Sequence, residues 1–133
     1  MSGKFLIQPD KANGLIRIVM AGFFSTLDLE RFIEARRRAH EMLGLAPNAH
    51  MTLNDVRRMK IQSPAMVEAF RGMLADPAYH SRRLAFVAGP TLARSQLMRA
   101  CAGRDARCFE DPAEAEAWLL EAKDSALPAR RVA

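Results

Sequence analysis

One short stretch decides the fold: the apolar run Leu84–Ala88 (LAFVA), which ends at Gly89-Pro90 and is followed by Thr91. An apolar run of this length between turn signals is typical of a central strand covered on both faces. Thr91 is a helix-capping residue type, so a helix is expected directly after the strand. A buried strand that leads into a helix predicts a parallel sheet with helices packed on it.

The sequence on either side of this stretch alternates strands and helices in the same way. Strands are predicted near 5–7, 15–21, 50–56, 84–88 and 106–109, and helices over 26–43, 64–75, 91–102 and 112–122. Two apolar runs around Asn13-Gly14 predict a β-hairpin at the start. The elements give an α/β sandwich of order β-β-α-β-α-β-α-β-α, with a mostly parallel central sheet, an antiparallel first strand and flanking helices.

Length and composition predict one domain. The chain has 133 residues, half of them apolar, which suffices for a core without disulfides. We expect a single domain over residues 1–124 and a C-terminal tail over 125–133. The sequence has two cysteines, no signal-peptide pattern and no apolar run long enough to span a membrane. We therefore expect a cytoplasmic protein with reduced thiols.

The net charge of +5 is unevenly distributed. Residues 1–104 carry 16 basic and eight acidic residues, whereas residues 105–124 carry two basic and seven acidic residues. The consecutive Arg36, Arg37 and Arg38 would spread over ~200° of a helix, so they cannot form one stripe. No aromatic residues are interleaved with the bases to stack on nucleobases. We expect no nucleic-acid binding.

No motif for catalysis, cofactors or metals stands out. The sequence lacks glycine-rich phosphate loops and a nucleophile elbow. His40, His50 and His80 are far apart in the sequence, and a surface or helix-end role is expected for His40. Cys101 and Cys108 are seven residues apart, which fits neither a redox pair nor a zinc site, so we expect two small buried side chains. We assign no catalytic residue, cofactor or metal.

One basic loop carries the candidate interaction residues. Asp55 is expected where a strand meets a loop, at the edge where α/β sheets place ligands. Arg57, Arg58 and Lys60 follow in the loop, and Ser63 precedes Pro64 at a helix start. Helix amides with nearby cations favour a phosphate, either bound or covalent. The simpler alternatives are that Ser63 only caps the helix and that Asp55 only bonds loop amides.

Three phrases, together with the element order, carry a resemblance to a known family. They are Thr52–Arg57 (TLNDVR) before the Ser-Pro helix start, Arg83–Ala88 (RLAFVA), and Arg107–Asp111 (RCFED) leading into Ala115–Leu119 (AEAWL). Over roughly residues 4–122 the chain resembles the SpoIIAA-like proteins of the STAS superfamily, which are related to bacterial anti-sigma-factor antagonists. The resemblance implies the fold and a small noncatalytic module.

The resemblance also implies a role for Ser63. In antagonist members a partner kinase phosphorylates a serine or threonine at the start of the helix after the third strand, and this releases the anti-sigma factor. Ser63 occupies the matching position. Here Gln62 precedes the serine and Pro64 follows it, where the family usually has an Asp-Ser-Ser/Thr-Gly type of sequence.

Three functions follow as hypotheses. The first is a noncatalytic regulatory module that contacts a protein partner through the loop from Asp55 to Ser63. The second is a carrier of a small hydrophobic ligand such as a lipid, of SEC14-like type, with Leu27, Met59 and Ile61 near its opening. The third is an enzyme that pairs Asp55 with a histidine from another loop. Homodimerisation through an edge strand is compatible with all three, with no interface identified.

Overall fold

The computed structural model describes residues 2–89, 95, 98–99, 101 and 103–132, with side chains as far as residue 122. The helix predicted between Thr91 and Gly103 therefore lies largely outside the described residues. The described strands form one five-stranded sheet in the order β1-β2-β3-β4-β5. They are β1 (Lys4–Asp10), β2 (Leu15–Gly22), β3 (Met51–Met59), β4 (Arg83–Val87) and β5 (Ala106–Phe109).

The strand directions confirm the predicted α/β class. β1 is antiparallel to β2, and the pairs β2–β3, β3–β4 and β4–β5 are parallel. The hairpin register runs from Lys4 opposite Ala21 to Asp10 opposite Leu15. The hairpin turn closes with a hydrogen bond from Gly14 N–H to the Lys11 carbonyl, and Gly14 has a φ of 60°. β1 is therefore an edge strand, which among the described residues pairs with β2 alone.

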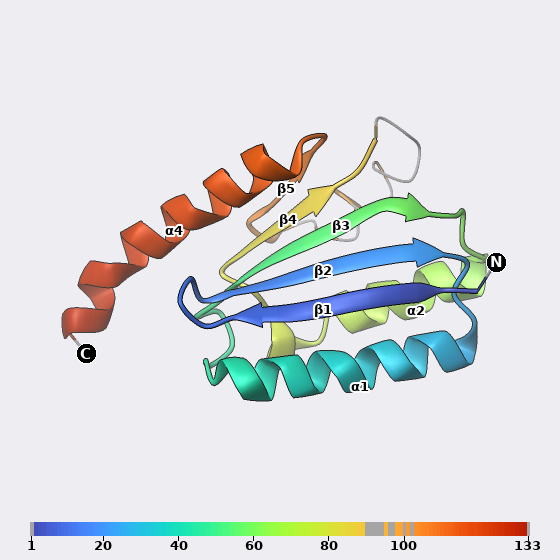
Figure 1. Ribbon diagram of the computed structural model, residues 1–133, viewed down its shortest axis with the longest axis horizontal. Helices are drawn as coiled ribbons and strands as arrows, with labels where there is room; N and C mark the ends of the chain where they lie inside the picture. The colour runs from blue at the N-terminus through green and yellow to red at the C-terminus, as the bar shows by residue number, and fades with distance from the viewer. Residues whose placement is uncertain (1, 90–94, 96–97, 100, 102, 133) are drawn as a thin grey trace.

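The helices lie on both faces of the sheet (Figure 1). They are α1 (Thr26–Leu43), α2 (Pro64–Leu74), the short 3₁₀ helix η1 (Pro77–Tyr79) and α4 (Pro112–Val132). Figure 1 shows α1 and α2 side by side below the sheet, and α4 on the opposite side. No helix in the described part of the chain is long and apolar enough to cross a membrane.

Alternation along each strand divides the core between the two faces. Leu15, Leu53 and Val87 pack with Trp118 and Leu119 on the α4 face. The intervening residues of β2 pack against α1 and α2, in a cluster that joins Ile16, Ile18, Met20, Phe24, Phe32 and Met66. The apolar run that predicted a central strand is buried throughout, from Leu84 to Ala88.

The helix boundaries follow from local capping. The Ser25 Oγ accepts a hydrogen bond from Asp28 N–H, and the Asp28 carboxylate accepts one from Ser25 N–H, which satisfies two donors at the start of α1. Gly44 ends α1 with a φ of 70°, a left-handed conformation that suits glycine. These caps confirm the predicted bounds of the first helix.

The third strand is longer than predicted, and the prediction of a basic loop after it is wrong in part. Arg57, Arg58 and Met59 belong to β3, which continues because β2 offers backbone partners as far as Gly22. The register of β2 and β3 shifts between Val19 and Ala21, so β3 holds one additional residue there. Asp55 therefore lies within β3, and it is the last residue of this strand to pair with β4.

The final helix is also longer than the sequence indicated. The prediction ended it near residue 122, whereas the backbone of α4 is helical as far as Val132. Residues 123–127 are mostly good helix formers, so the helix can continue beyond its buried part. The division into a domain over 1–124 and a tail over 125–133 stays a prediction.

Candidate functional site

Ser63 begins α2, as predicted, and its side chain caps the helix. Its backbone is extended, with φ −64° and ψ 156°. Its Oγ accepts a 3.1 Å hydrogen bond from Met66 N–H, and its carbonyl accepts a 2.9 Å bond from Val67 N–H. Pro64 occupies the first helical turn, where a missing N–H costs nothing. The hydroxyl thus lies at the positive end of the α2 dipole.

Gln62 holds the loop before Ser63 in place. Its Oε1 accepts a 2.9 Å hydrogen bond from Phe24 N–H. Its Nε2 donates to the Gly22 carbonyl at 3.0 Å and to the Lys60 carbonyl at 2.6 Å. One side chain thereby joins the β3–α2 loop to the β2–α1 connection. In the sequence, Gln62 stands out only as a departure from a family pattern, because an isolated glutamine gives no signal of such long-range bonds.

Large apolar side chains are exposed around Ser63. They lie in the β2–α1 and β3–α2 connections, which Gln62 joins, and in the first turns of α1 and α2. They are Phe23 (46% exposed), Leu27 (53%), Ile61 (88%) and Val67 (36%). The first turns of both helices lie at the same end of the molecule in Figure 1. We refer to these four side chains and Ser63 as the loop surface. Exposed apolar groups that cluster in this way are typical of interaction sites.

Asp55 and Arg57 form an ion pair on the other face of the sheet. The Arg57 guanidinium donates to both carboxylate oxygens of Asp55, at 3.0 and 2.7 Å. Partial burial is the largest single influence and raises the pKa of Asp55, but the bonds and charge of Arg57 outweigh it and lower this pKa. Asp55 lines a shallow pocket with Val19 and Pro112, so it lies on the α4 side.

The five candidate residues do not share one surface. Arg58 is opposite Ala21 in the register, two positions from the Val19–Asp55 pair, which places it on the α4 face with Asp55 and Arg57. Ser63 begins α2, which covers the opposite face. Lys60 links the two groups: its N–H donates to the Gly22 carbonyl, and its side chain is exposed. Their roles in binding or modification stay predictions.

The structure brings together two of the three histidines. The His40 ring packs edge to face against the His50 ring, with 4.6 Å between the ring centroids. It packs in the same way against the Tyr79 ring, with 4.8 Å between the centroids. His50 is only 1% exposed, so its ring belongs to the core. Burial lowers the pKa of His40 to about 4, with the charges of His50 and Arg36 adding to the effect. Burial likewise lowers the pKa of His50 to about 4.

These histidines lie far from Asp55. His50 directly precedes β3, and Asp55 is five residues further along the same chain direction. Since an extended strand rises about 3.3 Å per residue, their backbones are about 16 Å apart. His40 touches His50, and the His80 carbonyl bonds to Asn48 N–H at the same end of the sheet. The geometry that would pair Asp55 with a histidine in an active site is therefore missing.

The remaining candidates differ in burial. Met59 packs with the cluster around Phe24, and Leu27 lines a groove beside β1. Cys101 is 2% exposed, as predicted, and Cys108 is partly buried against the same cluster as Leu84 and Phe86. Among the described residues no group of three or more His, Cys, Asp and Glu side chains has the arrangement of a metal site.

The fold defines the class of domain. The chain is an α/β domain with a SpoIIAA-like fold. It is similar to an uncharacterized protein of the DUF3478 family from Shewanella loihica, which has a SpoIIAA-like fold; the TM-score is 0.65 and the identity 16%, over 89% of this chain and 94% of that chain.

A second solved structure is similar over the same region. It is an anti-sigma factor antagonist from Mycobacterium paratuberculosis, with a TM-score of 0.55 and 12% identity, over 88% of this chain and 93% of that chain. At these identities the likeness shows the fold alone. No protein-family model matches the sequence, and no curated protein matches it significantly.

Proposed function

We propose that this chain is a noncatalytic regulatory module of the cytoplasm that binds a regulatory protein through the loop surface. The observation that carries the proposal is the exposed apolar group around Ser63, presented by a loop that Gln62 holds rigid. A rigid loop loses little conformational entropy on binding, so its apolar side chains contribute fully to affinity.

The structural likeness supports a class of partner. One of the similar structures is an anti-sigma factor antagonist, a protein named for its action on another regulatory protein. We infer that the partner here is a protein of the anti-sigma-factor kind. It would cover Ile61, which is the most exposed side chain of the loop surface. The exposed side chain of Lys60 lies in the same loop, where its charge favours a partner with acidic groups.

Ser63 is the position at which this binding would be regulated. A kinase would transfer the γ-phosphoryl group of ATP to the Ser63 Oγ, which loses its proton, and ADP would leave. The α2 N-terminus stabilises a phosphate there. The new charge of about −2 would lie among Phe23, Ile61 and Val67, where docking of an apolar partner surface would force its desolvation. Phosphorylation therefore weakens partner binding in this proposal.

Site-specific photo-crosslinking in the source cells tests the proposal. A photoreactive amino acid replaces Ile61 in one variant and Lys11 in a control, because Lys11 lies in the hairpin turn at the opposite end of the sheet. A protein captured from Ile61 and not from Lys11 is then purified, and its affinity is measured for the wild type and for Ile61→Asp, Ser63→Asp and Lys11→Asp.

The proposal predicts a loss of affinity of at least about tenfold for Ile61→Asp and Ser63→Asp, because each places a charge in the apolar contact. Lys11→Asp should bind like the wild type. Equal capture from the two positions, no capture at all, or unchanged affinity of both loop variants would overturn it.

A further inference from the structure

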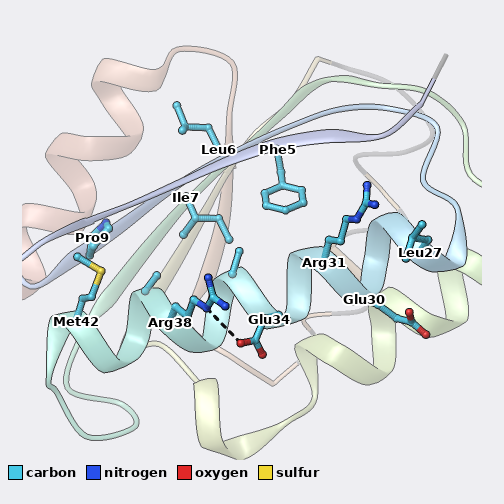
Figure 2. A pocket seen from close by; sticks show the side chains of 12 residues that line it. Phe5, Leu6, Ile7, Pro9, Leu27, Glu30, Arg31, Glu34, Arg38 and Met42 are labelled. Carbon is cyan, nitrogen blue, oxygen red and sulfur yellow. Dashed lines mark hydrogen bonds and ion pairs between the residues drawn. The ribbon is translucent and has the colours of Figure 1, made fainter.

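A groove runs along the free edge of the sheet, between β1 and α1 (Figure 2). Its volume is about 650 Å³, and its walls are mostly apolar, with Phe5 and Ile7 above and Leu27 and Met42 below. Leu27 and Met42 are 53% and 61% exposed. β1 is the first strand in the sheet order, so its outer edge has no neighbouring strand among the described residues. An apolar groove beside an unpaired edge strand is suited to a further strand.

The charges of β1 are complementary to those of a second β1. Lys4 and Asp10 are its two ends, and Ile7 is its central residue. An antiparallel pair of β1 strands centred on Ile7 sets Lys4 of one copy opposite Asp10 of the other, at both ends. Residues paired in this way are an even number of positions apart in the strand, so their side chains lie on the same face of the sheet. Phe5 and Ile7 of both copies would therefore face the α1 side. Pro9 lacks an N–H, and at each end the pairing uses its carbonyl alone.

The charges of α1 are complementary about the same axis. Glu34 and Arg38 both line the groove, one helical turn apart, and the Arg38 Nε lies 3.2 Å from the Glu34 Oε1. Figure 2 shows Ile7 directly above this pair. A two-fold axis through Ile7 that passes between Glu34 and Arg38 brings the Glu34 of each copy to the Arg38 of the other. The Glu34–Arg38 pair within each helix can thus be exchanged for a pair between the helices, two in all.

We propose that the β1–α1 groove is the interface of a two-fold symmetric dimer of this chain. The two β1 strands pair antiparallel about Ile7 and form a continuous ten-stranded sheet, with two α1 helices packed beneath. The apolar walls of both grooves close over each other, and Leu27 and Met42 become buried. This interface does not use Ser63 or Ile61, and Leu27 is the one side chain that it shares with the loop surface.

Charge reversal across the axis tests this interface. Glu34→Arg leaves arginines at both positions and Arg38→Glu leaves glutamates at both, so each variant alone brings like charges together at the interface. An equimolar mixture of the two variants restores both ion pairs, in a heterodimer only. Both side chains are exposed, at 47% and 71%, so the variants are expected to fold. Circular dichroism checks this, and Arg82→Glu, exposed elsewhere, serves as the control.

Sedimentation equilibrium of the full chain across the micromolar range gives the result. We expect a wild-type mass of twice the 14.8 kDa protomer, a dissociation constant raised at least about tenfold in each single variant, and recovery of the dimer in the mixture. A monomeric wild type, single variants that dimerise normally, or a mixture that stays monomeric would overturn the proposal. Native mass spectrometry could also overturn it, by finding a monomer with a bound hydrophobic molecule. In that case Met42→Asp would abolish binding of the molecule.

Discussion

The Gln62 Oε1 lies 2.9 Å from the backbone nitrogen of Phe24, although 38 residues separate the two in the chain. Together with its two bonds from Nε2, this contact joins the two connections that carry the loop surface. Gln62→Ala would leave the Phe24 N–H and the Gly22 carbonyl without this partner. We expect a loss of about 1–3 kcal/mol in the free energy of unfolding, measured by urea denaturation. Gln8→Ala, at an exposed position, is the control, and equal stability of the two variants would contradict the role of Gln62.

The cap of α2 gives a prediction that separates structure from regulation at Ser63. Ser63→Ala removes the acceptor for Met66 N–H and should lower the free energy of unfolding by about 0.5–2 kcal/mol. Ser63→Asp keeps a capping oxygen and should stay close to the wild type in thermal unfolding. If Ser63→Asp unfolds as readily as Ser63→Ala, its predicted loss of partner binding could not be ascribed to charge alone, and a binding measurement on Ser63→Asn would be needed.

Two glycines should respond oppositely to alanine. Gly22 has a φ of 81°, and a Cβ built there would lie 2.4 Å from the Ser2 carbonyl oxygen. Gly22→Ala should therefore lower the free energy of unfolding by about 1–3 kcal/mol. Gly72 lies inside α2, and a Cβ built there would have no atom within 4 Å. Gly72→Ala should therefore raise the free energy of unfolding by about 0.5–1 kcal/mol. A stabilised Gly22→Ala protein would show that the N-terminal segment does not lie against Gly22.

Arg17 joins the hairpin to α4. Its guanidinium donates to Asp10 at 2.7 Å and, through Nε, to Glu116 at 2.9 Å. Arg17→Met keeps much of the side chain's apolar bulk but leaves both half-buried carboxylates without this partner. We expect a loss of about 1–3 kcal/mol in the free energy of unfolding, which high salt should reduce only slightly. Arg82→Met, at an exposed position, should change stability by less than about 0.5 kcal/mol.

The buried His40–His50 contact predicts an acid-sensitive fold. Both rings have pKa values of about 4 in the folded protein, below the ordinary value of 6.5, because burial disfavours the charged form. Stability is therefore nearly complete above pH 6.5 and falls as the pH drops from 6.5 towards 4, by roughly 3 kcal/mol for each ring. Denaturation at a series of pH values gives the slope, and NMR titration gives the pKa of each ring. Ring pKa values near 6.5 would contradict the buried arrangement.

The sequence by itself determined the elements and their order. Apolar periodicity and capping residues are local signals, and they predicted the hairpin, α1 between Ser25 and Gly44, and the start of α2 at Ser63. The unbroken apolar run Leu84–Ala88, bounded by a turn signal, predicted a central strand, because a strand covered on both faces buries every side chain. These features depend on neighbours within a few residues, so they can be recognised along the chain.

Tertiary structure alone decided what lies beside what. β3 extends through Arg57 and Arg58 because β2 supplies backbone partners for them, and this places Asp55 and Ser63 on opposite faces of the sheet. The Gln62 bonds and the contact of His40 with His50 join segments that are distant in the chain. The groove beside β1 likewise exists only because α1 returns beneath the hairpin. Such pairings depend on strand register and helix placement, which no local pattern of residues encodes.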